Sequence, residues 1–145
     1  MDNPAPIVRH LDDLVPKLIS PADTVRLATL VRPDDGADTS VFFEIWEPGG
    51  AQPSNSHPDS VETFLFLSGE GEAYCDDAIS SVQAGQLLVL PPRSVHRIEN
   101  TGPGRLYAIT TMTPDAGFAA LVRAGVPEPL DSEDLAVLSA RFDRC

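Results

Sequence analysis

The sequence contains little cysteine, and that cysteine fits no recognisable pattern. Its two cysteines, Cys75 and Cys145, match no metal-binding or redox spacing, and Cys145 is the last residue. The fold therefore does not depend on a disulfide framework, which at this chain length a hydrophobic core can replace. A reducing compartment is the simplest setting for such a chain, and we expect a cytoplasmic protein.

Positive charge is also scarce, since 10 Lys and Arg stand against 22 Asp and Glu, for a net charge of -12 at pH 7. Binding to nucleic acid needs a positive field that replaces the counterions of the phosphates, so nucleic acid and acidic membranes are excluded as partners. No apolar run approaches the roughly 20 residues of a membrane span. The N-terminus also lacks the basic and apolar regions of a secretory signal.

The 145 residues include 14 Pro and 10 Gly, dispersed among apolar segments. At this length we expect one domain covering residues 1–145. Dispersed turn residues between short segments that alternate in polarity are typical of β-structure. We predict strands over residues 25–31, 41–47, 61–67, 72–75, 79–82, 86–90, 96–99 and 105–112. Many short strands at close intervals predict an all-β fold, either an antiparallel barrel or a sandwich.

The two ends of the chain read differently. Apolar residues near helical spacing within residues 1–20 predict a short amphipathic element, whose regularity is limited by Pro16. Residues 115–145 form a helical extension with predicted helices over 116–124 and 132–142, joined by a stiff connector. Either Asp131 or Ser132 caps the second helix.

The candidate chemistry centres on two of the three histidines. His57 and His96 both lie beside predicted strands in turn-rich segments, and Glu62 follows His57 by five residues. Alternation along the strand places Glu62 on the same face as Phe64 and Phe66. A carboxylate among phenylalanines is costly to bury unless a cation offsets its lost hydration. Glu62 is therefore a candidate metal ligand.

Two motifs in this region resemble those of the cupin superfamily. The pattern Gly49-x5-Asn55-x-His57-x4-Glu62-x6-Gly69 is similar to the first cupin motif, with Asn55 where its first histidine is usual. The pattern Gly85-x5-Pro91-x4-His96-x3-Asn100 is similar to the second, with Arg93 where a glycine is common. The resemblance spans residues 49–100, has the short inter-motif spacing of small microbial single-domain cupins, and implies a jelly-roll β-barrel.

The resemblance also implies one divalent metal ion inside the barrel. Its ligands are His57, Glu62 and His96, and Asn55 either supplies its amide oxygen or leaves the fourth position to water. Two histidines and one carboxylate with open positions suit non-haem Fe(II), although Mn(II), Ni(II), Zn(II) or Cu(II) fit the same ligands. The alternative is a cupin that keeps the motif for folding alone.

Other residues near the motifs have simpler interpretations. The motif glycines and Pro91 form turns, and Asn100 bonds to neighbouring backbone groups. Asp59 is an alternative ligand that the spacing disfavours, and His10 has no partner in register. Arg93 either binds an anionic substrate group over the barrel mouth or lies in solvent against the many carboxylates. Candidate pocket walls come from apolar residues on the predicted strands, namely Phe43, Ile45, Phe64, Phe66, Leu88, Leu90, Tyr107 and Ile109.

The resemblance favours a metal-dependent enzyme, and first an Fe(II) dioxygenase or oxygenase acting on a small organic molecule. A second possibility is an isomerase, cyclase or lyase in which Glu62 or Tyr107 transfers a proton. A third, of another class, is a cupin that binds a metal or small ligand without turnover. Small cupins often pair through N-terminal strands, so we expect a homodimer in which residues 24–31 extend the partner's sheet.

Overall fold

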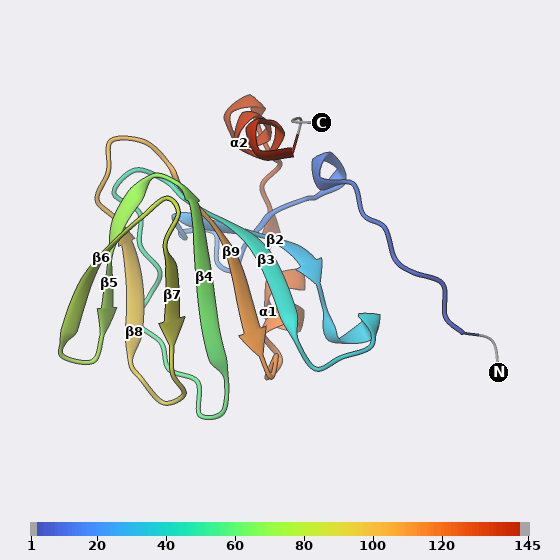
Figure 1. Ribbon diagram of the computed structural model, residues 1–145, viewed down its shortest axis with the longest axis horizontal. Coiled ribbons are helices and arrows are strands. Elements are labelled where there is room, and N and C mark those ends of the chain that lie inside the picture. The colour runs from blue at the N-terminus through green and yellow to red at the C-terminus, as the bar shows by residue number, and fades with distance from the viewer. Residues whose placement is uncertain (1–2, 143–145) are drawn as a thin grey trace.

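The structure is a computed structural model that describes residues 3–142 as two antiparallel sheets (Figure 1). One sheet has the strand order β10-β1-β2-β3-β9-β4-β7, and the other has the order β6-β5-β8. The elements are η1 (Leu11–Asp13), β1 (Lys17–Leu18), β2 (Val25–Val31), η2 (Pro33–Asp35), β3 (Ser40–Trp46), β4 (Val61–Ser68), β5 (Glu70–Cys75), β6 (Ala78–Gln83), β7 (Leu87–Leu90), β8 (His96–Asn100), β9 (Leu106–Thr113), α1 (Phe118–Arg123), β10 (Val126–Pro127) and α2 (Ser132–Phe142). The predicted all-β jelly-roll is confirmed.

Strand β4 shows how the sequence pattern builds the barrel interior. Glu62, Phe64 and Phe66 are buried, whereas Val61 and Leu65 on the opposite face are exposed. The two phenylalanines stack with ring centroids 6.3 Å apart. They join a core between the two sheets that also contains Phe42, Trp46, Ile98 and Leu106, with Leu88 and Leu90 of β7 packed into it. Because one face of β4 is exposed to solvent and the other is apolar and buried, the alternation could be predicted from the sequence.

Strand β3 presents two of its apolar residues to a different face from the one predicted. Phe43 and Ile45 lie on its outer face with Tyr107, where they pack against Leu138 of α2 and the partly buried Ile109. Phe43 stacks on Tyr107 with ring centroids 5.7 Å apart. The predicted pocket positions of these four β3 and β9 residues were therefore wrong. Because α2 covers the outer face, both faces of β3 are buried, and alternation alone gives no sign of which face is inside.

The N-terminal segment forms a short element of limited regularity. It contains one short turn, η1, followed by the two-residue strand β1, and no regular helix in its described part. In Figure 1 the segment before η1 runs away from the barrel, and its Ile7 and Val8 are exposed. Leu11 and Leu14 nevertheless pack against the cluster that contains Phe43 and Tyr107. Pro16 lacks a backbone donor, which disfavours a helix through this segment.

Strand β2 has a neighbour on each side, although β1 covers only part of it. It pairs with β3 along most of its length and with β1 on its other side, through Lys17 opposite Leu27. The edge strand there is β10, which pairs with β1 through Val126 and Pro127.

Helix α2 is fixed to the outer face of the large sheet by buried ion pairs. The Asp131 carboxylate accepts from the backbone N–H of Asp134 at 3.1 Å, and the Asp134 carboxylate accepts from that of Asp131 at 3.0 Å. This reciprocal capping starts the helix at Ser132, as predicted. Asp134 is fully buried and also accepts from Arg26 at 2.7 and 3.1 Å and from Tyr107 at 2.9 Å. A charged pair thus joins α2 to β2.

Cys75, on β5, is a free cysteine, whereas Cys145 lies outside the described residues. Within residues 3–142, no helix is long and apolar enough to cross a membrane.

The turn between β4 and β5 depends on Gly69. Its φ is +91°, and an added Cβ would lie 2.6 Å from the backbone oxygen of Arg105. Gly85 has a similar φ of +88° but open space around it. We therefore expect Gly69→Ala to cost about 3 kcal/mol of unfolding free energy and Gly85→Ala about 1 kcal/mol. Urea denaturation measures both, and equal costs would contradict the close approach to Arg105.

Candidate metal centre

Three side chains from separate elements converge inside the barrel. His57 lies in the loop before β4, Glu62 on β4 and His96 at the start of β8, and one ligand atom from each lies within 4.8 Å of the others. His57 Nε2 is 3.0 Å from Glu62 Oε1, and His96 Nε2 is 3.3 Å from Glu62 Oε2. The carboxylate thus lies between the two imidazoles, and the predicted grouping of the three residues is present in the structure.

The three groups alter one another's protonation. Burial alone would raise the pKa of Glu62, which is 6% exposed, but the two imidazoles more than offset it and lower that pKa below its usual value. The Glu62 carboxylate in turn raises the pKa of His57. A metal ion that binds here must displace the proton that Glu62 favours on the imidazole, so binding releases protons.

The donor atoms fit a metal ion better than they fit one another. His57 Nε2, His96 Nε2 and Asn55 Oδ1 are all buried without a well-aligned hydrogen bond to any described residue. The two nitrogens are near Glu62, but no ring N–H is directed at the carboxylate with hydrogen-bond geometry. Buried polar atoms without partners are rare and costly. Two imidazole nitrogens, a carboxylate and an amide oxygen are ligands of divalent transition metals.

Backbone pairing holds Asn55 beside His96. The two residues form an isolated antiparallel bridge, with N–H to O distances of 3.0 and 2.9 Å. His96 Nδ1 lies 3.1 Å from the backbone oxygen of Ser94, which orients the ring and leaves Nε2 facing the site. Asn55 therefore lies beside His96, and it lines the same pocket as Glu62.

Arg93 contacts the candidate metal centre through its backbone. Its N–H donates to the backbone oxygen of His57 at 2.7 Å, and its φ of +69° explains why glycine is common at this position. The side chain is exposed and lines none of the described pockets. Of the two interpretations of Arg93, the structure matches the solvent-exposed one.

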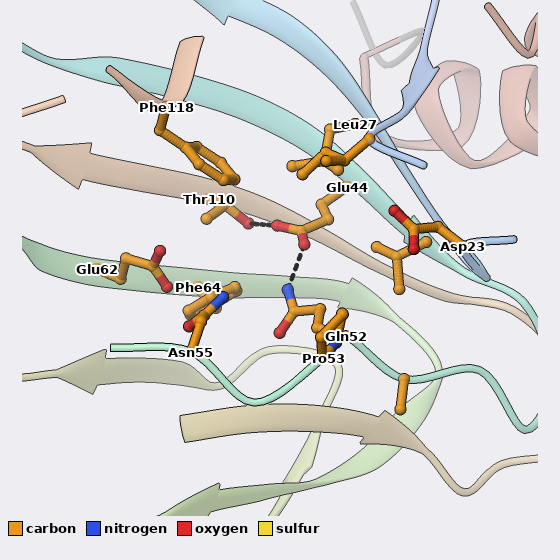
Figure 2. A pocket seen from close by; sticks show the side chains of 13 residues that line it. Asp23, Leu27, Glu44, Gln52, Pro53, Asn55, Glu62, Phe64, Thr110 and Phe118 are labelled. Atoms are coloured by element: carbon orange, nitrogen blue, oxygen red, sulfur yellow. Dashed lines mark hydrogen bonds between the residues drawn. The ribbon is translucent and has the colours of Figure 1, made fainter. Parts of the chain in front are cut away.

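A pocket lies beside Glu62 and Asn55 (Figure 2). The free volume of this pocket is about 50 Å³, which is room for a few water molecules. Glu62, Asn55 and the predicted Phe64 line it, whereas Phe66 and Leu88 are core residues outside its wall. Sequence reasoning missed the other residues that line the pocket, among them Glu44, Gln52, Thr110 and Phe118. Phe118, from α1, covers the site with its ring centroid 6.2 Å from that of His57.

The remaining candidates lie away from the site. The Tyr107 hydroxyl donates a hydrogen bond to Asp134 on the outer face of the large sheet, and burial raises the pKa of Tyr107. Tyr107 is therefore not placed to transfer a proton in the pocket. Asp59 and His10 are exposed, and neither belongs to the converging group.

This combination defines a jelly-roll β-barrel with a candidate metal centre between its sheets. The family described as the cupin domain matches residues 42–112 of the chain, and the fold is that of solved cupin-domain structures. No curated protein matches its sequence.

Similar solved structures support the same fold. A predicted oxalate decarboxylase from Thermotoga maritima is 21% identical with a TM-score of 0.67, over 73% of this chain and 97% of that one. A cupin-2 domain from Rhodospirillum rubrum is 19% identical with a TM-score of 0.63, over 96% of this chain and 90% of that one. A Cupin 2 conserved barrel domain protein from Salinispora arenicola is 23% identical with a TM-score of 0.61, over 83% and 95%.

Asn55 provides a direct test of the fourth position. Its side-chain oxygen is a weak neutral donor, so we expect Asn55→His to raise Zn(II) affinity by about 10-fold or more by adding an imidazole. Competition with a coloured chelator measures the change, and Ser54→His, at an exposed neighbouring position, is the control. Unchanged or weaker binding in Asn55→His would show that residue 55 does not face the metal.

Proposed function

We propose that this cupin is a metal-dependent enzyme, and first an Fe(II) oxygenase that acts on a small organic molecule. The observation that carries the proposal is the group formed by His57, Glu62 and His96, of which Glu62 lines the pocket. Two histidines and one carboxylate leave coordination positions open, which is the arrangement typical of non-haem Fe(II) oxygenases.

Each residue has a defined part in this proposal. His57, Glu62 and His96 would hold the ion, and Asn55 offers its amide oxygen beside them. A bound Fe(II) would supply dioxygen activation and Lewis acidity. Phe64 and Phe118 form apolar walls that limit the water in the pocket and restrict the substrate's orientation.

The second candidate is an isomerase, cyclase or lyase that uses the metal only as a Lewis acid. One specific observation favours it, a second carboxyl group, Glu44, buried in the same pocket. Such reactions need a proton donor and acceptor close to the substrate. The third candidate is a cupin that binds a metal or small ligand without turnover. It would have the same metal ligands as the enzymes but would convert no compound.

Oxygen consumption separates these candidates. The protein is loaded anaerobically with Fe(II) or Zn(II) and offered a panel of small hydroxy, keto and phenolic compounds, with His57→Ala as the ligand-deficient control. An oxygenase consumes dioxygen with Fe(II) and one of the compounds, but not with Zn(II) or in His57→Ala. Turnover that proceeds equally with Zn(II) and without dioxygen would replace the oxygenase with the Lewis-acid enzyme. Tight metal binding with no turnover of any compound would favour the non-catalytic cupin.

A further inference from the structure

A second carboxyl group, Glu44, lies in the pocket near the candidate metal centre. It stands at the middle of β3, faces the barrel interior and is 2% exposed (Figure 2). Its neighbours in the strand, Phe43 and Ile45, face the other way into the core beneath α2. The side chain therefore meets the pocket and has no other route to solvent.

The contacts of Glu44 are neutral. Thr110 Oγ1 donates to Glu44 Oε2 at 2.6 Å, and Gln52 Nε2 donates to Glu44 Oε1. Among the described residues that line the pocket, the titratable ones besides Glu44 are Asp23 and Glu62, and both are acidic. No lysine or arginine is among those described lining residues. A charge on Glu44 would thus be buried without a cation of the chain beside it, which is unfavourable.

The surroundings of Glu44 favour its neutral, protonated form. Burial raises the pKa of Glu44 to about 8. The hydrogen bond from Thr110 opposes this rise, and the negative charge of Glu62 adds to it. A carboxyl group that is protonated near neutral pH in a pocket is suited to act as a proton donor.

We propose that Glu44 is a catalytic acid–base residue that donates a proton to, and takes it back from, a substrate filling the pocket beside Glu62. This rests on the second candidate function, an enzyme that uses the metal only as a Lewis acid. In the forward step the O–H bond of Glu44 breaks and the proton bonds to an oxygen or carbon atom of the substrate. The electron pair stays on the Glu44 carboxylate, which the hydrogen bonds from Thr110 and Gln52 stabilise. The reverse step restores the acid, so no oxidant or further reactant is needed.

The site also narrows the substrate class. The substrate binds the metal end of the pocket through one oxygen and presents a carbonyl or hydroxyl group to Glu44 at the other. A free carboxylate at that second position is disfavoured, because the titratable groups lining the described pocket are all acidic.

Infrared spectroscopy of the metal-free protein tests the state of Glu44 without any substrate. We expect a carbonyl band of a protonated carboxylic acid below pH 8 that disappears with a midpoint near pH 8. Glu44→Gln should lack the band. Thr110→Val should raise the midpoint by removing a bond to the charged form, and Glu62→Gln should lower it by removing a neighbouring negative charge. Absence of the band from the wild type, or its persistence in Glu44→Gln, would overturn the proposal.

Loading the protein with Co(II) tests whether Glu44 and the metal ion influence each other across the pocket. A bound cation offsets the charge of Glu62, so the infrared midpoint should fall on loading. The visible spectrum of bound Co(II) should change with that same midpoint, and Glu44→Gln should bind Co(II) normally but lose this change. If Glu44→Gln instead abolishes Co(II) binding, Glu44 is a ligand and the proposal is wrong. If the spectra of both proteins titrate identically, Glu44 exchanges no proton near the metal.

Turnover provides the last comparison. With a compound that the loaded wild type converts, Glu44→Gln should lower kcat by about 100-fold or more while Co(II) affinity stays unchanged. An unchanged kcat would remove Glu44 from the reaction. Failure of the wild type to bind any metal would defeat the proposed function while leaving the infrared result valid, so the two failures are distinguishable.

Discussion

His96→Ala is expected to lower Zn(II) and Co(II) affinity by roughly 100-fold or more. His96 is 3% exposed and its Nε2 faces Glu62 at 3.3 Å, so the substitution removes one of three converging donors. Removing even an outer partner of a metal ligand costs 10 to 100-fold in affinity, and a ligand itself costs more. Competition with a coloured chelator measures the affinity.

The control for this experiment is His10→Ala. His10 is exposed in the N-terminal segment and lies outside the converging group, so its loss should leave the affinity unchanged. Thermal unfolding of the metal-free variants checks that each remains folded. Equal affinities in His96→Ala and wild type would show that the metal is bound by other residues.

Asp134→Ala is expected to reduce the free energy of unfolding by about 3–5 kcal/mol. Asp134 is fully buried and receives two hydrogen bonds from Arg26, whose side chain is 5% exposed. Its removal leaves the Arg26 charge buried with only Glu47 as an ion-pair partner, and leaves the Tyr107 hydroxyl without its acceptor. Breaking a buried ion pair on one side carries a cost of this size.

A matched control lies one residue earlier on the same helix turn. Glu133 also pairs with an arginine, Arg105, but its side chain is 59% exposed, so Glu133→Ala should cost less than about 1 kcal/mol. Urea denaturation gives both values. A cost for Asp134→Ala within the range of Glu133→Ala would mean that the pair with Arg26 does not hold α2 on the sheet.

The parts of the fold that could be predicted from the sequence are the elements with one solvent-exposed face and one buried face. Strand β4 alternates cleanly, so the inward positions of Glu62, Phe64 and Phe66 followed from it. Helix α2 has a capping residue and acidic first turn, and its predicted bounds match the structure. Both signals are local, and local signals survive folding when the surroundings do not override them.

The errors come from faces whose covering is set by distant segments. Strand β3 is buried on both sides, because α2 returns to cover its outer face, so Phe43 and Ile45 were assigned to the wrong side. Glu44 was missed although it has the same signal as Glu62, a carboxylate within an apolar run. Asp134 carries charge at a helix start, which predicts solvent exposure, and only the tertiary contact with Arg26 shows otherwise.

The most direct test of the metal centre is the metal content of the wild-type protein purified without chelator or metal-affinity steps. Elemental analysis should find about one equivalent of a divalent transition metal per chain, bound through His57, Glu62 and His96. The same preparation of Glu62→Gln should contain close to none. No metal above background in the wild type, or an equal content in Glu62→Gln, would contradict the assignment of this site.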